Sequence, residues 1–361
     1  IHTQHQYKLA NSFEHFSLEE KSVNLVVTSP PYPMIQMWDE IMGRYDSRIM
    51  PAIAKEDGAP AFEYMHELLD RTWKECYRIL KPGGFACINI GDATRTLDGK
   101  FQLYSNHSRI INACTGLGFS PMPSIIWRKP TNSPTKFMGS GMLPAGAYIT
   151  LEHEWILVFR KEGKRSFNKE EQILRRQSAM FWEERNKWFC DQWSDVLGTS
   201  QKMSPKANRK RSAAYPLEIA NRLIAMYSMY GDTVVDPFSG TGTTGLAAIM
   251  LGRNSVNFDA DESIVEESTL LPTKRDTKGI LNTTIATRVT DHMNYVASKD
   301  MLFFKYKNSG MGVPIKTQQE KEMYLFAINS ISRKEEEVNV KYRKWKKSEL
   351  QEMILASNLG G

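Results

Sequence analysis

The sequence is poor in cysteine and has no long run of apolar residues. The four cysteines, Cys76, Cys87, Cys114 and Cys190, lie far apart and form no Cys-x-x-Cys pair. This spacing predicts neither a zinc site nor a disulfide framework, and it is typical of a reducing compartment. No stretch approaches the ~18 consecutive apolar residues of a membrane span, and no basic segment followed by an apolar core opens the chain. We therefore expect a cytoplasmic protein with no metal site and no membrane contact.

The sequence also lacks a dominant charge. Lysine and arginine number 47 against 41 aspartates and glutamates, which leaves a net charge of +6. Such a balance fits a polyanionic partner only where the basic residues gather on one local face. With 361 residues, of which 41% are hydrophobic, the chain is long enough for one large core with smaller additions.

Apolar runs alternate with amphipathic segments along the chain. Residues 23–27 and 85–90 are short apolar runs, typical of buried strands, and residues 62–80 carry apolar side chains at helical spacing. Further strands are expected at residues 124–127, 155–159, 233–235 and 255–258, and further helices at 106–117, 216–230 and 244–251. This alternation predicts a doubly wound α/β fold with a mixed sheet built from both ends of the chain.

A glycine-rich loop connects a predicted strand to a helix. It reads Asp236-Pro237-Phe238-Ser239-Gly240-Thr241-Gly242-Thr243-Thr244. The glycines allow close approach of a ligand to the backbone, and the helix N-terminus offers free N–H groups. A P-loop would need a lysine before the last threonine, and a dinucleotide fingerprint would need a third glycine. Asp236 is expected to bind an amino-acid ammonium and Asp259, at the next strand end, ribose hydroxyls, a pair that suits S-adenosylmethionine.

A second loop, Ser29-Pro30-Pro31-Tyr32, follows the first buried strand. The exocyclic amine of a nucleobase is a poor nucleophile because its lone pair is delocalised into the ring. Two hydrogen-bond acceptors, the Ser29 hydroxyl oxygen and the Pro30 carbonyl, would aim that lone pair at a methyl group. Tyr32 would stack on the base, which must leave the duplex to be reached. We therefore predict that these four residues are catalytic.

Together the two loops resemble those of the amino-methyltransferases of bacterial restriction-modification systems. The order, with the loop at Ser29 first and the loop at Asp236 last, resembles the circularly permuted beta class of that family. The resemblance covers about residues 7–263 and extends to four other segments: Leu80-Lys81-Pro82-Gly83-Gly84, Trp127-Arg128-Lys129-Pro130, His153-Glu154-Trp155 and Arg211-Ser212-Ala213-Ala214-Tyr215-Pro216.

The resemblance implies a Rossmann-like fold and methyl transfer from S-adenosylmethionine to a base of double-stranded DNA. Serine at the first loop position, Ser29, goes with cytosine N4 in this family, whereas aspartate or asparagine goes with adenine N6. It further implies a cognate restriction endonuclease, places Ser212 beside the methionine carboxylate, and leaves Asn11 where relatives use Gly-Asp to contact the cofactor adenine. Methylation of adenine or RNA, and a non-catalytic nucleic-acid-binding module, remain alternatives.

The predicted domain boundaries follow from these segments. Residues 1–160 form the catalytic half, 161–205 a target-recognition insertion, 206–263 the cofactor-binding half, and 264–361 a C-terminal extension of unknown role. The candidates for DNA phosphate contacts are Lys202, Lys206, Arg209 and Lys210. Trp182, Trp188 and Trp193 either stack on bases or form a small core.

Two other features have simpler interpretations. We expect His153, at the start of a strand, to pack rather than to catalyse. The basic run at residues 341–347 is expected to be helical, and it either contacts phosphates or forms a solvated helix face.

Overall fold

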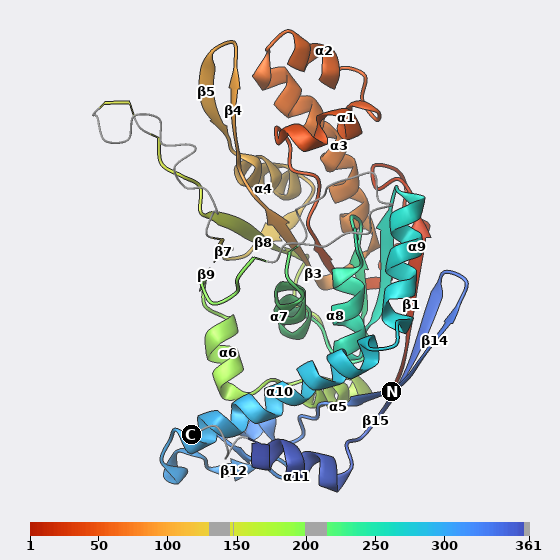
Figure 1. The fold of residues 1–361 in the computed structure, drawn as a ribbon, viewed down its shortest axis with the longest axis vertical. Coiled ribbons are helices and arrows are strands. Elements are labelled where there is room, and N and C mark those ends of the chain that lie inside the picture. The colour runs from red at the N-terminus through yellow and green to blue at the C-terminus, as the bar shows by residue number, and fades with distance from the viewer. Residues whose placement is uncertain (130–144, 147, 199–214, 357–361) are drawn as a thin grey trace.

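The computed structural model describes residues 1–129, 145–146, 148–198 and 215–356, and it is organised around one mixed sheet (Figure 1). The strand order is β14-β15-β1-β11-β10-β2-β3-β8-β7-β9, with β6 paired to β8 off this path. The strands are β1 (His2–Leu9), β2 (Val23–Thr28), β3 (Leu80–Ile90), β6 (Phe119–Pro121), β7 (Ile125–Arg128), β8 (His153–Lys161), β9 (Gln192–Trp193), β10 (Thr233–Asp236), β11 (Asn254–Asp259), β14 (Ala327–Lys334) and β15 (Glu337–Arg343).

The central strands β1, β11, β10, β2 and β3 run parallel, and β8 closes this block in the antiparallel direction. Every residue of β2 is buried, as expected for a strand covered on both faces. Leu25 and Val27 pack under α7 (Leu217–Tyr227) and α8 (Thr243–Leu251). Val26 packs on the other face with α3 (Gly58–Ile79) and α4 (Asn106–Gly116). The predicted doubly wound α/β fold is confirmed.

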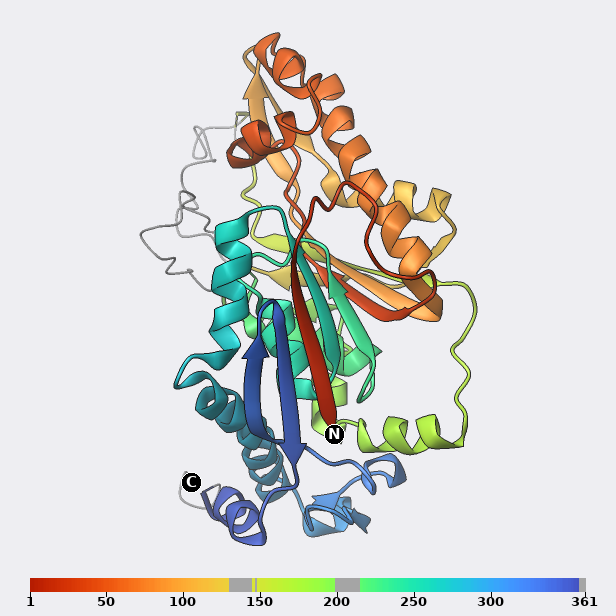
Figure 2. The same cartoon turned by 90° about the vertical axis from the view of Figure 1, so that its right-hand side faces the viewer.

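The C-terminal extension continues the main sheet. Its hairpin β14–β15 adds to the edge through antiparallel pairing of β15 with β1, and Figure 2 shows this hairpin beside β1. Three helices, α9 (Glu262–Leu270), α10 (Thr277–Ala297) and α11 (Lys347–Ala356), belong to the same region. The prediction of a helix over residues 341–347 is wrong, because the first three of them end β15 and α11 begins only at Lys347. Val338 and Val340 face the core with the two-residue period of a strand.

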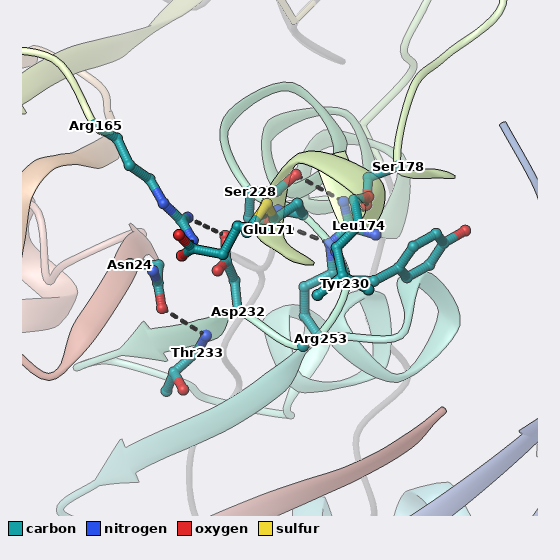
Figure 3. A network of polar contacts seen from close by, with 12 residues as sticks. Asn24, Arg165, Glu171, Leu174, Ser178, Ser228, Tyr230, Asp232, Thr233 and Arg253 are labelled. Carbon is teal, nitrogen blue, oxygen red and sulfur yellow. Dashed lines mark hydrogen bonds and ion pairs between the residues drawn. The ribbon is translucent and has the colours of Figure 1, made fainter. Parts of the chain in front are cut away.

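The helices of the predicted insertion lie at the amino ends of the strands, whereas its strand β9 pairs with β7 in the main sheet. These helices are α5 (Lys169–Gln177) and α6 (Trp182–Trp188), drawn low in Figure 1. Arg165, ahead of α5, forms a 2.7 Å ion pair with Asp232, one residue before β10, and Figure 3 shows this contact. Trp188 and Trp193 are buried in the core shared with α7, so they are core residues rather than exposed stacking surfaces.

Short elements extend the molecule beyond the carboxyl ends of the strands. They are α1 (Asp39–Gly43), α2 (Ile49–Ala54) and the hairpin of β4 (Ala93–Leu97) with β5 (Lys100–Tyr104), all at the top of Figure 1. At the other end of the molecule, β12 (Tyr306–Lys307) pairs with β13 (Pro314–Ile315). Among the residues described here, no helix is both long and apolar enough to cross a membrane.

Candidate active site

One pocket opens where four parallel strands end. Because β1, β11, β10 and β2 are parallel, the segments that follow them meet at a single edge of the sheet. The pocket encloses about 1220 Å³, including its open mouth. It is lined by residues 11–13 after β1, 29–32 after β2, 237–241 after β10, and 259–260 at the end of β11. The two loops that the sequence singled out, about 200 residues apart, therefore share one cavity.

Helix α1 and the residues on either side of it form another wall of this pocket. Trp38, Ile41 and Arg44, together with Tyr45, line it from that side. None of these four was predicted from the sequence as a site residue. The Arg44 side chain is exposed, so this wall places a guanidinium at the pocket beside the two loops.

All four predicted catalytic residues line the pocket. Pro30 and Pro31 are buried, while Ser29 and Tyr32 are half-buried. The Ser29 and Tyr32 hydroxyl oxygens lie 3.2 Å apart. Burial, assisted by the neighbouring Glu154 carboxylate, raises the pKa of Tyr32 well above 10. The Tyr32 hydroxyl therefore keeps its proton at neutral pH.

Two polar residues behind this loop, Asn89 and Glu154, were not predicted as site residues, although Glu154 belongs to the His153-Glu154-Trp155 segment of the resemblance. The Tyr32 hydroxyl donates to Glu154 Oε2 at 2.9 Å, and Asn89 Nδ2 lies 2.8 Å from the same hydroxyl. Glu154 also forms a 2.7 Å ion pair with Lys129. The antiparallel pairing of β8 with β3 brings Glu154 beside the catalytic loop, and no local pattern predicts that pairing. His153 contacts the Trp155 ring edge-on, which fits the expected packing role.

Asp236 lies behind the pocket wall with both carboxylate oxygens engaged. Thr28 Oγ1 donates to its Oδ1 and Thr244 Oγ1 donates to its Oδ2, each at 2.6 Å, and the Phe238 N–H donates at 3.0 Å. The Thr244 hydroxyl also contacts the Tyr215 hydroxyl. Burial raises the pKa of Asp236 to about 6, even though the two threonine hydroxyls favour its ionised form. The side chain thus joins β2 to the start of α8.

The remaining predicted cofactor residues divide between the pocket surface and the layer behind it. Those on the pocket surface are Asn11, Pro237, Phe238, Gly240, Thr243 and Asp259, whereas Gly242 and Thr244 lie behind them with Asp236. The Asn11 side chain is bonded within its own turn, donating to Glu14 at 2.8 Å and accepting from the Phe13 N–H at 3.0 Å.

The glycine-rich loop leaves room for a ligand against its backbone. Gly240 has φ +50°, and a Cβ added there would meet no protein atom within 4 Å. Its N–H donates to Asp259 Oδ2 at 3.1 Å, while Asp259 Oδ1 accepts from the Asp261 N–H. Gly242, with φ +83°, precedes the first residue of α8. The pocket therefore combines the Asp259 carboxylate, the open backbone at Gly240 and the N-terminus of α8. This set of hydrogen-bond donors and acceptors fits S-adenosylmethionine.

Several predicted site residues lie outside the described residues. Ser212 and the candidate DNA contacts Lys202, Lys206, Arg209 and Lys210 all fall within residues 199–214. Within the described ranges, no group of three His, Cys, Asp or Glu side chains is arranged to hold a metal ion.

Comparison with known proteins places the chain in a family. The N6_N4_Mtase family of DNA methylases matches residues 23–270. The type II methyltransferase M.MthZI of Methanothermobacter thermautotrophicus is 47% identical over 328 residues, which cover 90% of each chain. The type II methyltransferase M.MjaI of Methanocaldococcus jannaschii is 46% identical over 289 residues, covering 76% of this chain and 94% of the relative.

Solved structures agree with this assignment. TTHA0409 of Thermus thermophilus, in complex with S-adenosyl-L-methionine, is 32% identical with a TM-score of 0.54, and the match covers 70% of this chain and 87% of that one. The PvuII DNA methyltransferase (cytosine-N4-specific) matches 70% of this chain and 80% of its own at 18% identity and a TM-score of 0.50, which shows the shared fold alone. The expected Rossmann-like methyltransferase fold is confirmed, and the chain belongs to the N6_N4_Mtase family of DNA methylases.

Proposed function

We propose that this protein transfers a methyl group from S-adenosylmethionine to the exocyclic N4 amine of a cytosine extruded from double-stranded DNA. The observation that carries the proposal is the shared pocket, which is lined both by Ser29 to Tyr32 and by Gly240 and Asp259. Family membership supports DNA as the substrate. The S-adenosylmethionine bound to TTHA0409, which shares 32% of aligned residues, supports the cofactor.

The cofactor half of the pocket holds and orients the methyl donor. When bound, S-adenosylmethionine supplies an electrophilic methyl group on a sulfonium centre. Asp259, fixed by the Gly240 N–H, accepts hydrogen bonds from ribose hydroxyls, and the α8 N-terminus faces the amino-acid end. Asp236, behind the pocket, supports the loop that would hold the cofactor ammonium, through its bonds to Thr244 and the Phe238 N–H. Ser212 would contact the methionine carboxylate, and Asn11 would lie beside the adenine.

The catalytic half of the pocket prepares the amine. Ser29 Oγ and the Pro30 carbonyl accept its N–H protons, and these hydrogen bonds favour a pyramidal nitrogen whose lone pair points at the methyl group. Tyr32 stacks on the extruded base. Cytosine is proposed because Ser29 is short and uncharged, as in the cytosine-N4 members of the family that the loop resembles.

The target base is tested by analysing the product. Bacterial genomic DNA is methylated in vitro with labelled S-adenosylmethionine, digested to nucleosides and separated by mass. We expect N4-methyldeoxycytidine. N6-methyldeoxyadenosine in its place would make the base assignment wrong and leave the family assignment intact, whereas a protein that binds DNA without transferring label would be a non-catalytic module.

DNA contacts are proposed for the basic residues before α7. Of the predicted target-recognition insertion, residues 161–205, helices α5 and α6 lie at the amino ends of the strands, away from the pocket. We therefore assign DNA recognition to the C-terminal end of this insertion, and phosphate contacts come from Lys202, Lys206, Arg209 and Lys210. Removing the last three charges together should weaken DNA binding and flatten its salt dependence by about one unit of slope per lost contact. An unchanged slope in a fluorescence titration would contradict this assignment.

The biological setting follows from the same proposal. The enzyme acts in the cytoplasm and protects sites that a cognate restriction endonuclease cleaves. Expression of the chain should make host DNA resistant to an endonuclease of matching specificity, and digestion of the extracted DNA measures that resistance.

A further inference from the structure

A buried carboxylate behind Ser29 has no role in the chemistry described so far. Glu154, at the start of β8, is only 9% exposed. Its Oε1 accepts from Lys129 Nζ at 2.7 Å, and its Oε2 accepts from the Tyr32 hydroxyl at 2.9 Å and from Asn89 Nδ2 at 2.7 Å. These contacts connect the carboxylate to the catalytic loop through Tyr32.

The chemistry of these groups fixes the direction of the hydrogen bonds. The two Glu154 oxygens face the Lys129 ammonium and the Asn89 amide nitrogen, groups that only donate, so Glu154 acts as an acceptor. The single proton of the Tyr32 hydroxyl is therefore directed at Glu154. Asn89 faces the carboxylate with its amide nitrogen, because its amide oxygen would be a second acceptor there. That nitrogen also donates to the Tyr32 oxygen at 2.8 Å.

The direction of the Tyr32 hydrogen bond also determines how the Ser29 hydroxyl is oriented. Its hydroxyl oxygen is 3.2 Å from the Tyr32 oxygen, and the only proton of Tyr32 is already directed at Glu154. Ser29 must then be the donor in this contact, with its proton pointing at the Tyr32 oxygen. Its oxygen, 3.4 Å from Asn89 Nδ2, keeps lone-pair density to accept from an amine in the pocket. A serine hydroxyl free to rotate could equally present its proton to the amine and oppose the reaction.

We propose that Glu154 is a positioning residue, which orients the Ser29 hydroxyl as an acceptor through Tyr32 and is the final destination of the proton released from the amine. This inference rests on the proposed function and assigns a residue beyond the predicted catalytic loop. It holds for any exocyclic amine, so it does not depend on the choice of cytosine.

The proton path balances. As the amine nitrogen forms its bond to the methyl carbon, the electron pair of the breaking bond leaves with sulfur, and the nitrogen becomes cationic. One amine proton then passes to Ser29 Oγ, the Ser29 proton passes to the Tyr32 oxygen, and the Tyr32 proton passes to Glu154 Oε2. Glu154 Oε2 then carries the proton, while Oε1 keeps its contact with Lys129 Nζ. The high pKa of Tyr32 keeps it protonated between turnovers.

The test compares kinetics among matched variants. The substrates are tritiated S-adenosylmethionine and bacterial genomic DNA, and kcat and the KM for DNA are measured for the wild type, Glu154→Gln, Tyr32→Phe and the double variant. We expect each single variant to lose about 100-fold in kcat, the scale of acid–base and orientation effects, with KM unchanged. The double variant should lose no more than either single one. Glu152→Gln, a carboxylate 38% exposed and 3.6 Å from Arg128, is the control and should keep wild-type kinetics.

The kinetics of these variants would overturn the role of Glu154 in two cases. A kcat of Glu154→Gln within about threefold of wild type, or a double variant that loses the product of the two single effects, would overturn it. If circular dichroism shows that Glu154→Gln is unfolded, the kinetics of Tyr32→Phe, which keeps the aromatic ring, test the inference instead. Wild-type kcat and KM for Tyr32→Phe would then overturn the proton path from Ser29 to Glu154. A wild-type protein that labels no DNA would overturn the proposed function as well, whereas an active wild type with an equally active Glu154→Gln overturns only this inference.

Discussion

Replacing Asp236 with asparagine should change how stability depends on pH. The carboxylate is 1% exposed, and burial raises its pKa from 3.8 to about 6. Below about pH 3 the group is protonated in both the folded and the unfolded state, and above about pH 7 it is ionised in both. Because the folded pKa is the higher one, the folded state holds the proton more tightly, and stability from this group falls as pH rises through that window.

The size of the effect follows from the two pKa values. Each tenfold change in a dissociation constant corresponds to about 1.4 kcal/mol, so the rise to about 6 corresponds to about 3 kcal/mol. The asparagine side chain has the same shape and does not titrate. The free energy of unfolding of Asp236→Asn, relative to wild type, should therefore increase by about 3 kcal/mol between about pH 3 and about pH 7. Any constant cost of facing the amide towards Thr244 cancels in this comparison.

Urea unfolding across that pH range, without cofactor, measures the difference. Asp46→Asn is a control of opposite sign, because the Arg48 guanidinium lowers the pKa of Asp46, and its ionised form stabilises the folded state above the ordinary pKa. The Asp46 variant should thus lose stability relative to wild type as pH rises. A stability difference for Asp236→Asn that is constant with pH, or that follows the sign of the control, would refute the reasoning.

Two further pairs of substitutions test the loop and the C-terminal extension. Gly240→Ala and Gly231→Ala should each lose about 1 kcal/mol in urea unfolding, since both glycines have positive φ, but only Gly240 lines the pocket. Calorimetry should show S-adenosylmethionine affinity reduced about tenfold, or ~1.4 kcal/mol, in Gly240→Ala alone, and equal affinities would contradict the site. Glu184 contacts the Arg288 guanidinium at 2.5 and 2.7 Å, so Glu184→Ala leaves that charge without its partner and should lower the free energy of unfolding by about 3–5 kcal/mol. Glu322 is exposed, and Glu322→Ala should lower the free energy of unfolding by less than about 1 kcal/mol. Similar losses in the two glutamate variants would show that burial does not set the cost.

Local sequence was sufficient to locate the loops and the elements beside them. The strand before Ser29, the helix ending near Lys81 and the strand–loop–helix unit around Gly240 all form within two residues of their predicted ends, apart from the start of α3. These predictions succeeded because a buried parallel strand is a continuous apolar run and glycine permits positive φ. Strand β1 and the β14–β15 hairpin were missed, since their alternating polar residues resemble solvated segments until they pair at the sheet edge.

The tertiary structure decided which predicted site residues line the pocket and which lie behind it. The sequence alone determined that Ser29 and Asp236 follow strands, and that their loops have the residue types for amine methylation. It could not place Asp236 behind the pocket, because that depends on Thr28 and Thr244 arriving from two other elements. Nor could it bring Glu154 to Tyr32, because that contact requires β8 to run antiparallel to β3 in one particular register. The residue types at a strand end can be recognised from the local sequence, whereas the partners of a buried charge depend on which distant strands and helices pack beside it.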